Sequence, residues 1–380
     1  MNGSGELAND SNGTASVPLA DWVEVLPAEL KATLVSLIGL GLVLGNVFVV
    51  VVILRSAALR NYTGYLTVSL ACADMLPGLL VIPFSVRPAW TGHWTYGQTL
   101  CMLTAFFSCV SALASTFSLV ALAVNRYILI VHAMKYQSII GTKLCVAMIG
   151  AAWILPVLSF STKIFEHKRY HFLPNAAHCT FDFAGPIDLA CGIAFVAVLV
   201  LVVSVLHCKV YAVARRHLKN IYHYNPHATE DKGAKTTAAI TFAFCLTWVP
   251  YCVLAVWQHM LEYPTHPDVE FALLWLFPCH GIVNVFIYSG LNRAFREQAK
   301  KLLASLCTSV LQCLNEATGP RREDAITSPS PQARSGITGS SARTVDTTPT
   351  QTKEDILMKE LDIVRELDII SEFGPHQTGL

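Results

Sequence analysis

The sequence predicts an all-α membrane protein folded as a seven-transmembrane helix bundle with an amphipathic eighth helix. Three observations predict this class: the low charge of the chain, its long apolar segments, and the positions of the basic residues between them. Of the 380 residues, 53% are hydrophobic and 14% are charged, whereas a soluble domain carries about 25% charged residues. The composition therefore favours a chain that faces lipid.

The apolar segments are long enough to be membrane spans, since a helix needs about 20 apolar residues to cross a bilayer. They cover residues 33–55, 64–86, 99–131, 143–162, 186–211, 234–258 and 269–290. We expect the longest of them to include helical extensions into the cytoplasm. The membrane domain, with the eighth helix, is predicted over 31–305.

Basic residues predict the orientation, because Lys and Arg are retained on the cytoplasmic side. They gather in every second connection, around Arg55, Lys143 and Arg215, and again after the last span. We therefore expect a multi-pass plasma-membrane protein with an extracellular N-terminus. Residues 1–30 form the expected glycosylated tail, with acceptor sequences at Asn2, Asn9 and Asn12.

Two pairs of cysteines stand apart from the cysteines inside the spans. Cys101 and Cys179 lie in the predicted extracellular loops, where the compartment is oxidising, and we expect them to form a disulfide. Cys307 and Cys313 follow the last basic helix on the cytoplasmic side. They are either palmitoylated or unmodified.

Polar residues inside the spans are the candidate functional residues, because such groups are costly at membrane depth. Ser115 lies eleven residues before Arg126, close to three helical turns, so the two share a face and Ser115 reaches the depth of Asp74. Arg126 lies at the inner boundary, where its side chain either extends to water as an anchor or pairs with Glu230 on the sixth span.

Short motifs in a fixed order carry a family resemblance over roughly 30–305. They are "LGNVFVV", "SLACADMLPGLLVIPFSV", "NRY", "FCLTWVPY", "NVFIY" and "LNRAFREQAKKLL". This arrangement resembles the rhodopsin-family (class A) G-protein-coupled receptors. The resemblance implies a receptor that transmits an extracellular small-molecule signal to heterotrimeric G proteins, and to arrestin.

Within that family the stretches "FSLVALAVNRYILI", "KYQSIIGTK", "VYAVARRHLKNI" and "CTFDF" are most similar to adenosine receptors. Ala255, however, stands where those receptors have a purine-binding asparagine. The alternative is a biogenic amine or melatonin-like ligand, carried by "LRNYTGYLTVSL" and "VIPFS" for the amine receptors and by "NRY" and "CTF" for the melatonin receptors. Ser108 stands where amine receptors have an aspartate, which leaves the ligand undecided.

The resemblance also implies three sets of site residues. The ligand-binding set is Phe181, which would stack on the ligand, Asp182, which would accept from it, and Ser108, Ala112, Trp248, Cys252 and Ala255. The G-protein switch is Asn125, Arg126, Tyr127, Glu230, Tyr211 and Tyr288. Asp74, Ser115 and Asn284 match the positions that hold a structural sodium ion, and the alternative for them is a hydrogen-bonded cluster without an ion.

Two positions depart from the family pattern. Asn125 replaces the acid that usually neighbours Arg126, so the arginine loses its nearest counter-ion. Val285 replaces the proline that usually follows Asn284, which predicts a weaker kink in the seventh span. We expect the weakened lock at Arg126 to raise basal activity.

The cytoplasmic tail is predicted over 306–380. It is mostly disordered, being rich in Ser, Thr and Pro, and it has an amphipathic segment near 354–373 that could bind membrane lipid or a partner. The final residues, Thr378-Gly379-Leu380, have the form that PDZ domains bind.

Other functional classes have less support. A membrane transporter, the rival outside the receptors, predicts internal repeats or broken helices, and the two halves of the sequence show no repeat. The sequence has no nucleophile constellation, metal-ligand pair or phosphate-binding loop, so we expect no enzyme activity, no cofactor and no nucleic-acid partner.

Overall fold

The computed structural model describes residues 26–164, 170–181, 185–224, 232–259 and 265–318. Several predictions lie outside these ranges. They concern Asp182, Glu230, the acceptor sequences at Asn2, Asn9 and Asn12, and the tail beyond 318.

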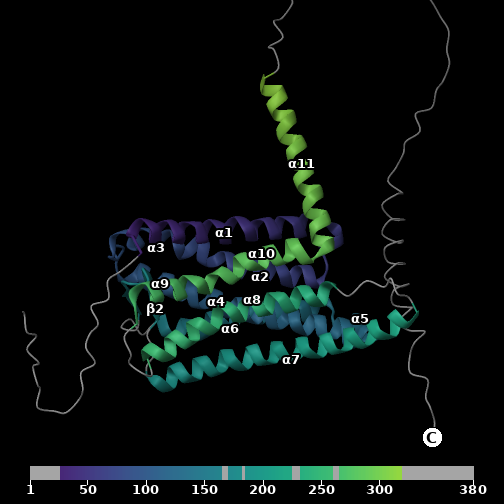
Figure 1. Cartoon of the computed structure of the whole chain (residues 1–380), viewed down its shortest axis with the longest axis horizontal. Coiled ribbons are helices and arrows are strands. Elements are labelled where there is room, and N and C mark those ends of the chain that lie inside the picture. Colours follow the sequence, from purple (N-terminus) through teal and green to yellow (C-terminus); the bar gives the residue numbers. More distant parts are fainter. Residues whose placement is uncertain (1–25, 165–169, 182–184, 225–231, 260–264, 319–380) are drawn as a thin grey trace, which may run out of the picture.

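Seven helical segments are long and apolar enough to cross a membrane, which confirms the seven-helix bundle (Figure 1). They are α1 (Ala28–Arg55), α2 (Tyr62–Leu80), α4 (Gln98–Val131), α6 (Thr142–Ile164), α7 (Pro186–Tyr224), α8 (Lys232–His259) and the seventh span, α9 (Pro267–Leu276) with α10 (His280–Leu291). A helical extension beyond a span, as expected, is the last part of α7, which runs to Tyr224.

Two spans are interrupted where prolines lie. The second span changes from α2 to α3 (Ile82–Thr91) at Val81, near Pro77 and Pro83. The seventh changes from α9 to α10 through the 3-10 turn η3 (Phe277–Cys279), which contains Pro278. A proline has no N–H for the helical ladder, so the seventh span breaks at Pro278, which the sequence analysis did not consider. Past Asn284 and Val285, where the usual proline is missing, α10 runs without a break to Leu291.

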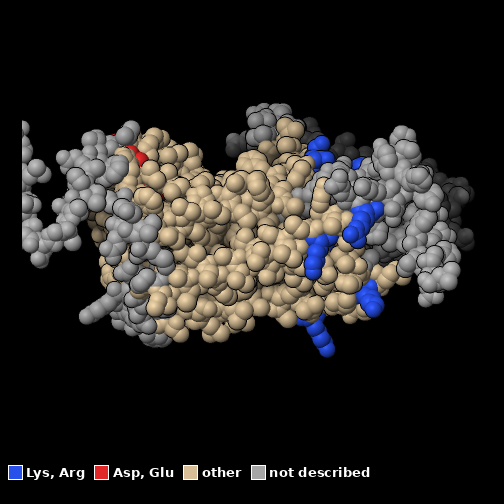
Figure 2. Space-filling model, turned by 60° about the horizontal axis from the view of Figure 1, so that its bottom comes forward, with Lys and Arg blue, Asp and Glu red and all other residues tan. Residues whose placement is uncertain are grey.

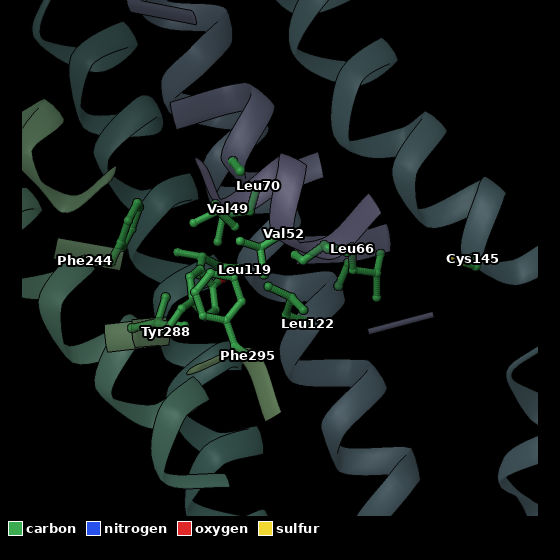
Figure 3. Close-up of a cluster of buried hydrophobic side chains, with 14 of the residues drawn as sticks. Val49, Val52, Leu66, Leu70, Leu119, Leu122, Cys145, Phe244, Tyr288 and Phe295 are labelled. Carbon is green, nitrogen blue, oxygen red and sulfur yellow. The ribbon is translucent and has the colours of Figure 1, made fainter. Parts of the chain in front are cut away.

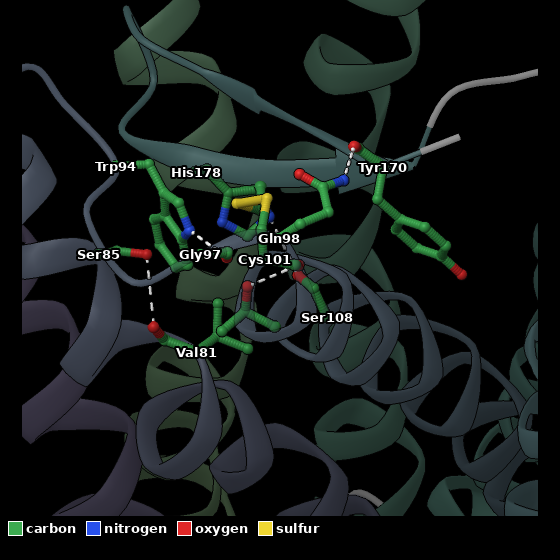
Figure 4. The surroundings of a disulfide bond; sticks show 11 residues. Val81, Ser85, Trp94, Gly97, Gln98, Cys101, Ser108, Tyr170 and His178 are labelled. Atoms are coloured by element: carbon green, nitrogen blue, oxygen red, sulfur yellow. Dashed lines mark hydrogen bonds between the residues drawn. A yellow bond between two sulfur atoms is a disulfide. The ribbon is translucent and has the colours of Figure 1, made fainter. Parts of the chain in front are cut away.

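A two-stranded hairpin covers one end of the bundle, and no feature of the sequence predicts it. Strand β1 (Tyr170–Leu173) pairs antiparallel with β2 (His178–Phe181). The predicted disulfide between Cys101 and Cys179 is present and ties β2 to the start of α4. Gln98 Nε2 donates to the Tyr170 carbonyl at 2.7 Å (Figure 4), so the hairpin is fixed to α4 at two points.

The predicted eighth helix is α11 (Arg293–Thr318), and it continues past the expected end at 305. It leaves the bundle and turns away from the direction of the spans (Figure 1). Phe295 and Ala299 are buried against the bundle, whereas Leu306 and Val310 lie exposed on the same apolar face. This exposed apolar stripe suits a helix that lies in a membrane interface.

The inner half of the bundle is held by one apolar cluster (Figure 3). Leu70 of α2, Leu119 of α4, Phe244 of α8 and Tyr288 of α10 contribute to it, with Phe295 of α11. The cluster also takes side chains from α1 and α6. Since seven helices contribute to it, movement of any one of them must repack it.

Basic side chains lie near the opposite end from the hairpin. On the face that Figure 2 shows, Lys and Arg gather at the end of the bundle where the short inner helices η2 (Ala133–Lys135) and α5 (Tyr136–Ile139) lie. The 3-10 turn η1 (Ala57–Leu59) joins α1 to α2. On this face the basic residues thus mark one end of the bundle, and the disulfide of the hairpin marks the other.

Gly281 predicts a local test of how α10 packs. A Cβ atom added there would lie 2.8 Å from Cβ of Asp74 and 2.9 Å from Cδ2 of Leu42. We expect Gly281→Ala to destabilise the protein by about 1–3 kcal/mol through overpacking, measured as a lower apparent melting temperature in detergent.

Gly290 of the same helix is the matched control, because an added Cβ atom there meets nothing within 4 Å. Gly290→Ala should leave stability unchanged or raise it slightly, as Ala favours helix. Equal losses in both variants would contradict the close approach of α10 to α2.

Candidate functional site

A cavity lies beneath the hairpin, between the outer halves of the spans. It takes its lining from α2, α3, α4, α6, α7, α8, α9 and η3, and from β2. The six described residues of the predicted ligand set all line it: Ser108, Ala112, Phe181, Trp248, Cys252 and Ala255. The structure therefore gathers this set from three separate elements.

The roof of the cavity is β2. Phe181 is buried and packs edge-on against Tyr170 of β1, with ring centroids 5.7 Å apart. The turn of the hairpin is held to the bundle by Trp275, whose Nε1 donates to the Ala176 carbonyl at 2.9 Å. The disulfide and this hydrogen bond together fix the roof over α4 and α9.

The floor is aromatic. The Trp248 ring lies 5.1 Å from that of Phe244, one turn below, and 4.7 Å from that of Phe277 in η3. Among the described residues, no acceptor pairs with the buried Trp248 Nε1. An indole N–H is a donor only, so the floor offers a hydrogen bond to a bound molecule.

The outer wall holds a polar pair that sequence reasoning missed. Ser108 Oγ lies 3.4 Å from Nε2 of His178 (Figure 4). Burial lowers the pKa of His178 to about 4, so its ring is neutral at physiological pH. The only sequence signal for His178 is its position beside Cys179, which the disulfide carries over α4.

No Asp, Glu, Lys or Arg occurs among the residues that the structure places in the cavity wall. The wall consists of aliphatic and aromatic side chains with a few neutral polar groups. Such a cavity can bind an apolar aromatic molecule and orient it by single hydrogen bonds.

A polar centre lies below the cavity, and it joins the residues predicted for sodium. The Asp74 carboxylate accepts from Ser115 Oγ at 2.7 Å and from Asn284 Nδ2 at 2.8 Å. His280, which we did not assign to the site, brings Nε2 to 3.3 Å from Asp74 Oδ1. All four side chains are buried.

These residues do not fit a sodium ion as they are arranged here. Sodium, as a hard cation, needs several oxygen ligands. Ser115 and Asn284 turn donors toward the carboxylate, and the third neighbour of Asp74 is a ring nitrogen. Asn284 Oδ1 is buried without a hydrogen-bond partner, but this single amide oxygen does not supply the several ligands that sodium needs. The geometry favours the alternative, a hydrogen-bonded cluster without an ion.

At the inner end, Asn125 is fully buried and has two partners. Its Nδ2 donates to Thr63 Oγ1 at 2.8 Å, and its Oδ1 accepts from the Tyr136 hydroxyl at 3.1 Å. The residue that replaces the usual acid thus connects α4 to α2 and α5. The sequence indicated only that a charge is missing at this position.

The other switch residues are not all brought together. Arg126 is partly buried, and the ring of its neighbour Tyr127 lies 5.6 Å from that of His132. Tyr288 is buried, whereas Tyr211 on α7 is 58% exposed. On α11, Cys307 is exposed, and the side chain of Cys313 lies outside the described part.

His178 gives a prediction about pH. Below its ordinary pKa of 6.5 the unfolded chain binds a proton that the folded chain does not, so stability falls as pH drops from 6.5 toward 4. We expect a loss of up to about 3 kcal/mol by pH 4. His178→Gln, which cannot titrate, should show a smaller fall in apparent melting temperature over this range. Identical pH profiles would contradict a buried neutral His178.

Comparison with known protein families agrees with this architecture. Residues 45–288 match the model of the family "7 transmembrane receptor (rhodopsin family)". This match covers all of the motifs that carry the resemblance except the eighth helix and the start of the first span.

Individual relatives cover most of the chain. The 5-hydroxytryptamine receptor 4 of Cavia porcellus is 27% identical over 72% of this chain and 79% of its own length. Trace amine-associated receptor 9 of Rattus norvegicus is 27% identical over 72% of this chain and 88% of its own. Melatonin receptor type 1A of Gallus gallus is 25% identical over 70% and 78%.

These proteins are receptors, which confirms the prediction that the chain is not an enzyme. The seven apolar helices, the order of the motifs and the family match lead to one conclusion. The chain belongs to the rhodopsin family of G-protein-coupled receptors.

Proposed function

We propose that this receptor responds to a neutral, aromatic, melatonin-like ligand rather than to a protonated amine. The observation that carries this proposal is the uncharged cavity wall, in which Ser108 pairs with a neutral His178. Family membership itself makes the chain a membrane receptor for a small molecule, with a G protein as its partner.

An ammonium group would be poorly accommodated in this cavity. Moving a charge out of water costs several kcal/mol unless a counter-ion and hydrogen bonds replace its hydration. The position that supplies the acid in amine receptors holds Ser108, and His178 offers no negative charge. Asp182, which lies outside the described residues, is the nearest acid in sequence to the roof.

A neutral aromatic ligand fits the same surfaces. Phe181 above and Trp248 with Phe277 below offer ring faces and edges, which bind aromatic molecules by offset or edge-on contacts. Ser108 and the Trp248 N–H supply hydrogen bonds that fix orientation without charge.

The relatives support the alternative expectation over the adenosine-like one. Their names include serotonin, trace amine and melatonin receptors, and the adenosine likeness depends on short stretches with Ala255 in place of the purine-binding asparagine. The serotonin and trace amine relatives make an amine receptor the second candidate, and the cavity chemistry opposes it.

The orientation is also part of the proposal. A disulfide-linked hairpin belongs in an oxidising compartment, and the basic end belongs in the cytoplasm. The ligand cavity then opens toward the extracellular side of the plasma membrane. Arrestin, a PDZ-domain protein and membrane lipid remain predicted partners of the tail.

The ligand is tested in cells that express the full receptor, with G-protein activation as the readout for melatonin, serotonin, tyramine and adenosine. We expect melatonin or a neutral relative of it to activate the receptor. The primary amines should be at least about 10-fold less potent, because losing one charge partner costs about 1.4 kcal/mol, which is a factor of ten in affinity.

Ser108→Asp is the matched variant, because it places a carboxylate where an ammonium would need one. It should gain a response to the amines and lose potency for the neutral ligand. Activation of the native receptor by serotonin or tyramine, with no response to melatonin, would overturn the proposal in favour of the amine receptor.

Asn125 provides a separate test of raised basal activity. Asn125→Asp restores a carboxylate beside Arg126, and it can still accept hydrogen bonds from the hydroxyls of Thr63 and Tyr136. We expect basal signalling to fall about two- to fivefold, which corresponds to the 0.5–1 kcal/mol of a partly exposed ion pair.

Tyr136→Phe is the control for this test, because it removes one hydrogen bond of Asn125 without adding charge. The measurement is cyclic AMP and calcium without ligand, at matched surface level. Basal signalling no higher than in mock-transfected cells, or unchanged by Asn125→Asp, would contradict the idea that the missing acid weakens the lock.

A further inference from the structure

His280 is a buried ionisable side chain that the proposed function does not use. It is the first residue of α10, directly after the break at η3, and it is 4% exposed. Its neighbour Gly281 lets α10 approach α2 so closely that an added Cβ atom would lie 2.8 Å from Cβ of Asp74. The helix break at η3 and the close approach allowed by Gly281 together bring the His280 ring to the Asp74 carboxylate.

The hydrogen bonds of the ring determine what lies between it and the carboxylate. Nδ1 of His280 lies 2.8 Å from the Phe277 carbonyl oxygen, which only accepts, so Nδ1 carries a hydrogen. Nε2 then lies 3.3 Å from Asp74 Oδ1, at ion-pair distance but without the geometry of a hydrogen bond. Two lone pairs would repel at this distance, and a proton on Nε2 makes the ring a cation that attracts the carboxylate instead.

Two hydrogen bonds also reach the carboxylate. Ser115 and Asn284 donate to it, one to each oxygen. Beyond His280 lie the rings of Phe244, with centroids 5.2 Å apart, and Phe277, at 5.9 Å. Aromatic rings cannot replace the oxygen ligands that a metal cation needs.

We propose that the His280 ring takes the place of a metal cation at Asp74. A side chain of the receptor itself then compensates the carboxylate charge, so the polar centre does not respond to sodium. The protonated imidazole and the carboxylate form an ion pair that compensates the buried charge without an external ion. The pair joins α2 to α10, and the contact of His280 with Phe244 extends it to α8.

The test measures the purified full-length receptor in detergent, without ligand, so that its outcome does not depend on the ligand proposal. Apparent melting temperatures are compared in sodium chloride and in N-methyl-D-glucamine chloride of equal ionic strength. The native protein should melt within about 1 °C in the two salts, since an ion that binds the folded state would raise the melting temperature.

His280→Asn and His280→Ser remove the ring and leave room and oxygen atoms beside Asp74. At least one of them should gain a sodium-dependent rise of about 2 °C or more. Adding Asp74→Asn to that variant should abolish the rise. These variants would then show that the ring is what excludes the ion.

The native receptor alone can overturn the proposal, whether or not the variants fold. A sodium-dependent rise in the native melting temperature that Asp74→Asn abolishes would show that an ion binds beside His280. A sodium effect that persists in Asp74→Asn would arise elsewhere and leave the native polar centre insensitive, as proposed. Folded His280 variants that gain no sodium response would contradict the exclusion by the ring.

Discussion

The structure depends on one buried carboxylate, that of Asp74. Within a membrane no water can satisfy it, and an unpaired carboxylate at this depth is costly. Ser115 on α4 and Asn284 and His280 on α10 all turn to it. The cost of leaving Asp74 without partners therefore holds α2, α4 and α10 in one relative position, and the close contact at Gly281 follows from that arrangement.

The same centre is connected to the ligand cavity through aromatic contacts. His280 packs on Phe244, Phe244 on Trp248, and Trp248 lines the cavity floor. A ligand acts on a receptor by stabilising one of two arrangements more than the other. Because Phe244 also belongs to the apolar cluster of the inner half, repacking of Trp248 has a direct physical route to the inner ends of the helices.

The spans, the disulfide and the grouping of Asp74, Ser115 and Asn284 could be predicted because hydropathy, compartment and motif order are local properties of the chain. The contact of His280 with Asp74 could not be predicted, since it needs both the break at Pro278 and the absence of a Cβ atom at Gly281. His178 was missed for a similar reason: its place over Ser108 arises from pairing of β1 with β2, which leaves no periodic signal in so short a hairpin. The length of α11 was underestimated because its apolar face continues beyond the basic residues that define its start.

Two polar sites of the bundle contain a histidine, and the two rings act in opposite ways. At the outer site no acid lines the described wall, and burial keeps His178 neutral beside Ser108, so nothing there attracts an ammonium group. At the Asp74 site the acid is present, and the proposed ion pair with His280 compensates its charge, so no metal cation is needed there. An imidazole can serve as donor, acceptor or cation according to its partner. Because of these two histidines, neither site needs a charge from a ligand or an ion. This is the physical reason to expect that a neutral molecule controls the receptor.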